Sequence, residues 1–389
     1  MDVRKCRMTG LRSKFGSEVK IIHLTTVHSP RDVRIFLKEC RTLALAGYEV
    51  VLIARGNKTE VVEGVKIVGS GLSRCRGDRM TRGLLRTFLL AYREQGRIYH
   101  FHDPELIPVG LLLKLAGKKV VYDVHEDFAA SLRESDREWL PPLLKWMTSY
   151  LIRLVEKMGV AVYDAAVVAT PKISSLFPSA KTVLVQNYPL LGELQSEKPV
   201  PYAQRPFNVI YAGGISERRG IREMISAIHA LRHNGKTKLL LAGEFSPPEL
   251  GEDIKNMPGW EQVEYLGLLS RGELAASLGR SRIGIALLHP IESYIYSQPI
   301  KLFEYMSAGI PVVVSNFPLW KDIVEKTGAG IVVDPLDKTA VSSAVKWLFD
   351  HEQEAERMGK NGASAVQHEM NWGTEAKKLL HLYKGLLDK

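Results

Sequence analysis

The chain has 389 residues, of which 45% are hydrophobic and 25% are charged, and its formal net charge is +10. This composition is that of an ordinary globular protein, so it argues against a disordered or fibrous chain, and the length favours two to three domains. The three cysteines, Cys6, Cys40 and Cys75, are too few and too widely spaced for a disulfide framework or a zinc site.

The basic N-terminus is not followed by an apolar segment, so we expect no secretory signal. No run of about 18 uncharged apolar residues occurs, so we also expect no membrane span. We therefore expect a cytoplasmic protein with reduced thiols.

The positive charge is concentrated in the first half, since residues 1–190 carry 30 Lys and Arg against 19 Asp and Glu, a net charge of +11. Such a localised field favours an anionic partner, such as a phospholipid surface, a lipid diphosphate or nucleic acid. A basic surface that only aids solubility is the open alternative. No nucleic-acid motif is present and the aromatic residues do not interleave with the basic ones, so we expect no nucleic-acid partner.

Strands and helices alternate along the first half. The predicted strands are 19–27, 48–54, 97–102, 119–125, 165–169 and 182–186. Helical patterns at 34–46 and 104–116 each end at a glycine suited to a C-cap. Apolar strands separated by helices are typical of a parallel, doubly wound sheet.

A proline-rich segment then precedes a second alternating series. Its predicted strands are 207–212, 238–242, 262–266, 282–287, 311–314 and 330–333. We expect a flexible extension at 1–17, an N-terminal Rossmann-like domain at 18–190, a linker at 191–206, a C-terminal Rossmann-like domain at 207–370 and a last helix at 371–389 that packs back on the first domain. In such sheets ligands bind beyond the carboxyl ends of the strands, so the strand-to-helix loops are the places to search.

Four segments in these loops carry the unusual residues. They are Tyr211-Ala-Gly-Gly-Ile-Ser-Glu-Arg-Arg-Gly-Ile221, Gln298-Pro-Ile-Lys-Leu-Phe-Glu-Tyr-Met-Ser-Ala-Gly309, Tyr99-His-Phe-His-Asp-Pro-Glu-Leu-Ile-Pro108 and Val120-Val-Tyr-Asp-Val-His-Glu-Asp127. On residues alone, Glu304 either complements a helix dipole or accepts ribose hydroxyls, and the cations are either solvated or bind phosphate.

Together these segments resemble the family-four glycosyltransferases, which retain anomeric configuration and have the GT-B fold: two Rossmann-like domains that face each other across a cleft. The last two segments resemble the branch of the family that makes bacterial surface polysaccharides. The resemblance covers roughly residues 19–370, with the four motifs in the family's order.

The resemblance implies a donor site in the second domain, for a UDP- or GDP-linked sugar. Arg219 and Lys301, assisted by Arg218, would bind the diphosphate, Gly213 and Gly214 would allow its close approach, and Glu304 would hold the ribose. The base would lie against the loop that contains Leu268.

In the first domain the resemblance places His125 beside the reacting carbon, which makes His125, Arg219 and Lys301 the expected catalytic residues. His28, Arg31, His102 and Asp103 are the expected acceptor-side residues. Because cations and helix ends can stabilise a leaving diphosphate, we expect no metal and no cofactor.

The sequence departs from the family pattern at several positions. Tyr296 stands where many relatives have a first glutamate, and Glu292 is too far along the chain to replace it in the same geometry. His28-Ser-Pro-Arg31 stands where a glycine pair is common, and Gly214 where an arginine is. A nucleotide-sugar epimerase and a non-catalytic nucleotide-binding or assembly protein of the same fold therefore stay open.

Basic and apolar residues also mix in two stretches of the first half. Arginines between 74 and 93 alternate with leucines, and Trp139-Leu-Pro-Pro-Leu-Leu-Lys-Trp-Met147 places two tryptophans among leucines. This pattern suits a protein that rests on an anionic bilayer, on the inner face of the cell membrane, with a lipid-linked acceptor. Two amphipathic helices packed on the sheet are the plain alternative.

Overall fold

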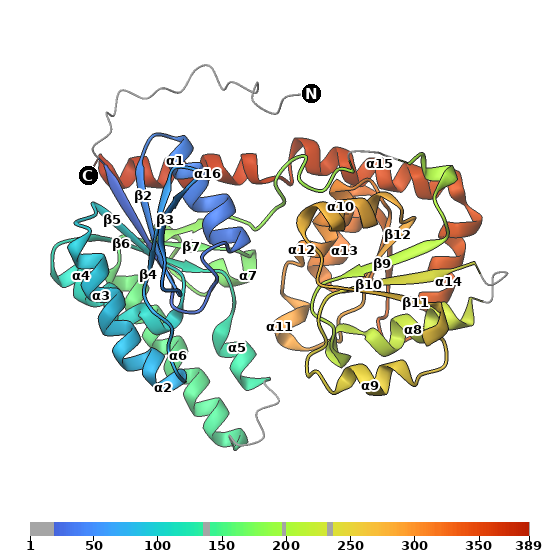
Figure 1. Ribbon diagram of the computed structural model, residues 1–389, viewed down its shortest axis with the longest axis horizontal. Coiled ribbons are helices and arrows are strands. Elements are labelled where there is room, and N and C mark those ends of the chain that lie inside the picture. The colour runs from blue at the N-terminus through green and yellow to red at the C-terminus, as the bar shows by residue number, and fades with distance from the viewer. Residues whose placement is uncertain (1–18, 135–140, 197–199, 232–235, 389) are drawn as a thin grey trace. The chain divides into compact units, whose positions relative to one another are not determined.

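The computed structural model describes residues 19–134, 141–196, 200–231 and 236–388. The extension expected at 1–17 lies outside these described residues. The chain forms two compact units, one made of Met1–Gln186 with Glu375–Lys389 and the other of Asn187–Thr374. Each unit is a sheet with helices on its faces (Figure 1). The last helix, α16 (Trp372–Leu387), starts in the second unit and returns to the first.

The sheet of the first unit has the order β3-β4-β2-β1-β5-β6-β7-β8 within the described chain. Its strands are β1 (Lys20–Leu24), β2 (Glu49–Ala54), β3 (Thr59–Val62), β4 (Val65–Gly69), β5 (Ile98–Phe101), β6 (Lys119–Val124), β7 (Ala165–Val168) and β8 (Thr182–Leu184). All neighbouring pairs are parallel except β3 and β4.

The helical segments of this unit are η2 (Val33–Cys40), α1 (Arg41–Leu45), α2 (Arg76–Asp78), η3 (Arg79–Gly83), α3 (Leu84–Arg93), η4 (Pro104–Leu106), α4 (Ile107–Leu115), α5 (Phe128–Arg133), α6 (Pro142–Val162), α7 (Pro171–Ser174) and η5 (Ser179–Lys181).

The hairpin of β3 and β4 is absent from the sequence-based prediction. β3 is short, and three of its four residues are exposed, so it lacks the apolar run by which the other strands were found. Glu63 and Gly64 connect the two strands with positive φ angles of 49° and 81°, a conformation that tightens the turn. The sheet is therefore parallel with one antiparallel edge strand.

The second unit has an all-parallel sheet of order β11-β10-β9-β12-β13-β14 in its described part. Its strands are β9 (Asn208–Ala212), β10 (Lys238–Ala242), β11 (Val263–Gly267), β12 (Ile283–Ala286), β13 (Val312–Ser315) and β14 (Gly330–Val333), which match the six predicted strands.

The helical segments of this unit are η6 (Tyr202–Gln204), η7 (Glu217–Arg219), α8 (Ile221–Ala230), α9 (Leu250–Lys255), η8 (Trp260–Gln262), α10 (Arg271–Gly279), α11 (Glu292–Ile295), α12 (Ile300–Ser307), α13 (Pro318–Thr327), α14 (Lys338–Asp350) and α15 (Glu352–His368). The segment expected as a linker, 191–206, lies inside this unit.

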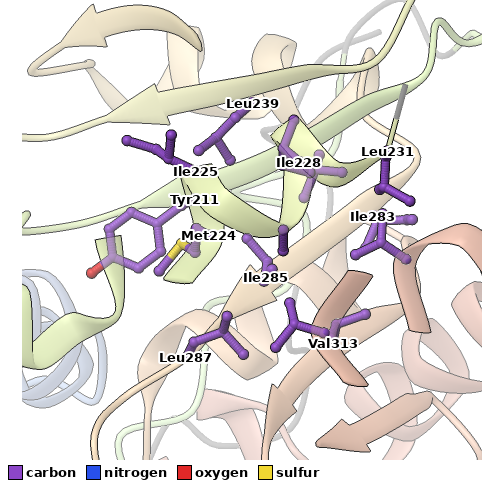
Figure 2. Packing of buried hydrophobic residues seen from close by; sticks show 14 of the residues in the cluster. Tyr211, Met224, Ile225, Ile228, Leu231, Leu239, Ile283, Ile285, Leu287 and Val313 are labelled. Carbon is purple, nitrogen blue, oxygen red and sulfur yellow. The ribbon is translucent and has the colours of Figure 1, made fainter. Parts of the chain in front are cut away.

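Strand β9 lies near the middle of this sheet. Its residues contribute to both hydrophobic cores, one on each face of the sheet. Because successive strand residues point to opposite faces, Val209 and Tyr211 enter one core and Ile210 and Ala212 the other. In the first core, Met224, Ile225 and other apolar residues of α8 pack against β9, β10 and β12 (Figure 2). Burial on both faces fixes the end of β9, and with it the loop that follows.

Within the described chain, no helix combines the length and the apolar composition needed to cross a bilayer.

Candidate active site

The loop after β9 contains the two predicted glycines. Gly213 has a φ of +142°, which L side chains rarely adopt, and its N–H donates to Ala242 O at 2.8 Å. Gly214 is exposed, and its carbonyl accepts hydrogen bonds from the hydroxyl of Tyr211 at 2.7 Å and from Arg219 Nη1 at 3.4 Å. The loop is thus held by its own neighbours in a conformation that depends on the absence of a side chain at Gly213.

Helix α12 carries Lys301 and Glu304. Pro299 precedes its first residue, where a missing N–H costs nothing, and Gly309, with a φ of +69°, follows the helix. Lys301 lies in the first turn, and Glu304 lies one turn later and is largely buried.

Lys301 extends into the space beside Gly213. A β-carbon on residue 213 would lie 2.2 Å from Lys301 Cε and 2.3 Å from its Nζ, so only glycine admits this lysine. The ammonium lies 5.3 Å from the ring centroid of Tyr211, a cation–π contact. Burial and the charge of Arg219 lower the pKa of Lys301 to about 8, although Glu304 acts in the opposite direction.

Arg219 lies at the end of η7, next to Gly220, whose left-handed φ of 71° lets α8 begin. Burial opposes ionisation of its guanidinium, but the hydroxyls of Tyr211 and Tyr294 raise its pKa. Among the described residues, neither Arg219 nor Lys301 forms an ion pair. Two mutually repelling cations beside a bare glycine loop are suited to an anion with several oxygens.

Glu304 is paired with Arg271, which the sequence analysis missed. Arg271 Nη1 donates to Glu304 Oε1 at 2.7 Å, and its Nε donates to Glu193 Oε1, also at 2.7 Å. Arg271 is the first residue of α10, directly after the capping-box residue Ser270. Because 33 residues separate Arg271 from Glu304, no local pattern in the sequence indicates the pair.

The remaining predicted donor residues lie at the rim. Arg218 is partly buried, and its carbonyl accepts from the N–H of His289 at 2.8 Å. Leu268 is 70% exposed, directly after Gly267, whose φ is +65°. An exposed apolar side chain on a loop is available to a flat ring such as a base.

In the first unit, His102 and Asp103 follow β5 and are both buried. Asp103 Oδ2 accepts hydrogen bonds from the hydroxyls of Thr25 and Thr26 at 2.9 and 3.2 Å and from the backbone N–H groups of Thr26 and Val27 at 2.6 and 3.3 Å. Asp103 therefore connects the loop after β1 to the loop after β5. A carboxylate fixed by four hydrogen bonds is better suited to shape the wall of a binding site than to act as a general base.

His28 and His125 meet at the same end of the sheet, with ring centroids 5.0 Å apart in an edge-to-face arrangement. The hydrogen bond of His28 to Asp32 and the nearby Asp103 raise the pKa of His28, despite burial. His28 Nε2 lies 3.4 Å from Asp103 Oδ1. Both histidines are partly exposed, so this pair is open to a ligand.

Arg31 does not join this pair. Its guanidinium donates to Glu60 Oε1 of β3 at 3.0 Å and lies 5.7 Å from the ring centroid of Phe36. An exposed arginine held by the edge strand is a weaker candidate for acceptor binding than His28.

The sequence analysis also missed the charged pair beneath His125. Asp123 is fully buried in β6, and Arg34 of η2 donates to both of its carboxylate oxygens, at 2.7 and 2.9 Å. Because Arg34 is adjacent, the pKa of Asp123 lies well below its usual range, against the effect of burial. A charged residue inside an apolar strand was the signal that would have revealed it.

Residues 193–365 match the family model described as "Glycosyl transferases group 1". The chain is 25% identical to a glycogen synthase of Mycobacterium tuberculosis over 47% of this chain and 45% of that protein. It is 21% identical to a phosphatidyl-myo-inositol mannosyltransferase of Mycobacterium leprae over 74% and 73% of the two chains. The chain spans about half the length of the first curated relatives it matches.

Solved structures share the fold over nearly the whole chain. Sucrose-phosphate synthase from Thermosynechococcus elongatus has a TM-score of 0.78 at 19% identity, over 95% of this chain and 99% of that one. The Anabaena protein Alr3699/HepE in complex with UDP has a TM-score of 0.69 at 12% identity, over 94% and 100%. The expected fold is thereby confirmed, since the chain has the GT-B fold, and residues 193–365 are similar to the glycosyl transferases group 1.

Proposed function

We propose that this protein transfers a sugar from a nucleoside-diphosphate donor to an acceptor hydroxyl, with retention of the anomeric configuration. The observation that carries the proposal is that Lys301 and Arg219, which form no ion pair within the described residues, converge on the loop of Gly213 and Gly214. The group 1 domain supports it, and so do the UDP and UDP-glucose complexes of the Anabaena protein with the same fold.

In this proposal Lys301 and Arg219 bind the diphosphate and neutralise the charge that develops as it leaves, without a metal ion. Gly213 and Gly214 offer the diphosphate close approach and a backbone with no side chain in the way. Glu304 accepts ribose hydroxyls, while Arg271 holds its Oε1.

The proposed reaction is a front-side displacement. The bond between the anomeric carbon and the diphosphate oxygen breaks, the acceptor oxygen bonds to the same face of that carbon, and the acceptor proton passes to the departing diphosphate. No side chain has to serve as the base. We assign the acceptor to the end of the sheet in the first unit where His28, His125 and Asp103 lie.

The proposed acceptor is lipid-linked, as in surface-polysaccharide synthesis, and the protein rests on the anionic inner face of the cell membrane. Helix α6 supports this part of the proposal, because ten of its apolar side chains are exposed: Leu143, Leu144, Trp146, Met147, Tyr150, Leu151, Leu154, Val155, Met158 and Val162. Leu85 and Leu89 of α3 and Leu112 and Leu115 of α4 are exposed as well. The first tryptophan of the predicted stretch, Trp139, lies outside the described residues.

An apolar surface of this size on a protein with a basic first half suits adsorption to anionic lipid. Vesicles with and without phosphatidylserine test it in a flotation assay. We expect wild type to float with the anionic vesicles and the double variant Trp146→Ser, Leu151→Ser to remain in solution. As control, Trp347→Ser in the second unit removes one comparably exposed tryptophan and should float as wild type does. Equal flotation of all three proteins would remove the membrane from the proposal.

Isothermal titration without added metal tests the donor site. UDP, GDP, ADP and their common sugar conjugates are titrated into wild type, Arg219→Ala and Glu304→Ala. We expect one nucleotide to bind wild type and both variants to lose most of the affinity. Arg222→Ala is the matched control, because Arg222 lies three residues further on and pairs with Glu217 outside the glycine loop. Absence of binding to every nucleotide would overturn the proposal.

Tyr296 supports a second candidate, a protein that binds a nucleotide but transfers nothing. It is 43% exposed where many relatives have a glutamate, so one contact to the donor is missing or replaced. Nucleotide binding with neither transfer to any lipid-linked acceptor nor donor hydrolysis would favour this candidate. Conversion of the donor sugar without an acceptor would indicate an epimerase.

A further inference from the structure

One face of the sheet in the first unit carries a cluster of buried polar side chains among its apolar residues. His23 of β1 and His100 of β5 are register partners, and His102 and Asp123 follow on the same face. All four side chains are fully buried. Tyr383 of α16, also without exposed area, completes the layer. Burying so many polar groups costs free energy unless each one has a partner.

The five side chains form one continuous series of contacts. His100 Nδ1 lies 2.8 Å from the hydroxyl of Tyr383, and this hydroxyl lies 3.3 Å from His23 Nε2. His23 Nδ1 lies 2.9 Å from His102 Nε2, and His102 Nδ1 lies 3.0 Å from Asp123 Oδ2. Each ring uses both nitrogens except His100, whose Nε2 has no partner.

The charge of Asp123 decides the direction of these hydrogen bonds. Asp123 is ionised beside Arg34, so His102 Nδ1 must donate to it. Burial lowers the pKa of His102 and of His23, so both rings are neutral. A neutral ring has one N–H, so His102 Nε2 accepts from His23 Nδ1, and His23 Nε2 accepts from Tyr383.

Tyr383 can serve as this donor because burial raises its pKa and keeps its proton in place. Its oxygen in turn accepts from His100 Nδ1. This leaves His100 Nε2 as a lone acceptor, in agreement with its lack of a partner. The chain of donors therefore runs in one direction, from His100 through Tyr383, His23 and His102 to Asp123.

The series ends at a group of the proposed acceptor site. Asp123 Oδ2, which accepts from His102, lies 3.5 Å from His125 Nδ1. That nitrogen is buried, faces the carboxylate of Asp123 and forms no hydrogen bond with any described residue. An ionised carboxylate at this place favours the Nδ1–H form of His125 and leaves its Nε2 as an acceptor.

We propose that Tyr383 is a positioning residue: through His23 and His102 it fixes Asp123, and Asp123 holds His125 in the tautomer that presents Nε2 as a hydrogen-bond acceptor to a hydroxyl of the bound substrates other than the attacking one. The part of this inference that concerns activity rests on the function proposed above. A residue of the last helix thereby sets the state of a histidine at the opposite end of the chain of hydrogen bonds.

A metal ion is the competing occupant, because Glu39, His23, His100 and His102 place one ligand atom each within 4.8 Å of one another. Two observations favour a hydrogen-bonded cluster without a metal ion. His23 Nδ1 and His102 Nε2 are 2.9 Å apart, whereas nitrogens about 2.0–2.1 Å from one tetrahedral zinc ion lie roughly 3.3 Å apart. The guanidinium of Arg34 also lies 3.3 Å from Glu39 Oε1, which opposes a further cation.

Histidine side-chain NMR on the full chain tests the tautomers. Signals of ¹⁵N-labelled histidines are assigned by their loss in His23→Gln and His102→Gln. We expect His23 and His102 of wild type to be Nδ1–H tautomers and the His23 signals to move in Tyr383→Phe. Tyr163→Phe is the control, because Tyr163 is equally buried in the same unit but donates to Ile107 O, outside the series. An Nε2–H form of His102 would overturn the proposal, as would one metal ion per purified chain.

Kinetics test the positioning. With the donor and acceptor found for wild type, kcat of Tyr383→Phe should fall on the order of tenfold, as expected when the loss of one hydrogen bond in the series leaves Asp123 and His125 less well oriented. Nucleotide affinity and the kcat of Tyr163→Phe should be unchanged. An unaltered kcat in Tyr383→Phe would contradict the positioning role while leaving the proposed function intact. If wild type transfers nothing, the proposed function fails, and the histidine spectra still decide the tautomers.

Discussion

The side chain of Lys301 fills the volume that a β-carbon on residue 213 would need. The two residues are 88 positions apart in the sequence, yet the identity of one limits the other. The contact joins the loop after β9 to the first turn of α12, and so joins the two motifs that make up the predicted donor site.

Gly213→Ala should therefore abolish nucleotide binding with only a moderate loss of stability. The new methyl group would displace the end of the lysine, which is flexible, and force a φ of +142° on a residue that resists it, at a cost of about 1–3 kcal/mol. Titration with the nucleotide that binds wild type measures the first effect, and thermal unfolding the second. Gly272→Ala is the control, since its β-carbon meets nothing within 4 Å. Wild-type affinity in Gly213→Ala would show that Lys301 does not bind the diphosphate.

Nucleotide affinity should fall as the pH rises above 8. The pKa of Lys301 is about 8 in the free protein, since burial and Arg219 lower it, and a bound diphosphate would raise it again. Above pH 8 binding must then take up a proton, and affinity should fall by up to about tenfold per pH unit. The phosphate does not mask this change, because its last pKa is about 6.

Titrations between pH 7 and 9.5, in buffers of different ionisation enthalpy, measure this proton uptake. Lys301→Met should bind weakly and show no such pH dependence. If wild type and the variant respond to pH in the same way, another group is responsible.

Arg271→Ala should weaken binding of ribonucleotides about tenfold, because Glu304 loses the hydrogen-bonded cation that orients its carboxylate. The 2′-deoxy form of the same nucleotide should lose less. In the double variant with Glu304→Gln, the losses should not add, since both act through one carboxylate. Arg280→Ala removes an equally short pair, with Glu264, and should bind as wild type does. Additive losses would mean that Arg271 acts on the nucleotide independently of Glu304.

The first unit should lose stability as the pH rises from 5 to 8. Burial raises the pKa of Glu156 to about 7, despite Arg153 and the hydroxyl of Tyr122, which donates to it at 3.1 Å. The folded state therefore holds a proton that the unfolded state has released above its own pKa near 4.3, and stability falls until the folded group also ionises. The total over the whole shift is at most about 4 kcal/mol, from roughly 1.4 kcal/mol per pKa unit.

Calorimetry of the full chain at pH 5.5 and pH 8 checks this prediction. Glu156→Gln should reduce the difference between the two melting temperatures of the transition that reports the first unit. An unchanged difference would assign the pH dependence to other groups.

The sequence by itself determined the alternation of strands and helices, because apolar runs and glycine caps are local signals, and it found all strands of the described second unit. It also indicated the loops that carry Gly213, Arg219, Lys301 and Glu304, since these residues follow strands or open helices. It missed the hairpin of β3 and β4, because the short, exposed β3 lacks an apolar run that would mark it as the partner of β4.

Only the tertiary structure decided which side chains meet. The pairs Gly213 with Lys301, Arg271 with Glu304, Arg34 with Asp123 and Tyr383 with His23 join residues 33 to 360 positions apart. Such pairs follow from strand order and from the path of the last helix, and neither leaves a local pattern. The sequence shows which reactive side chains each loop carries. The fold determines which partner lies beside each of these side chains and so sets its charge and protonation state.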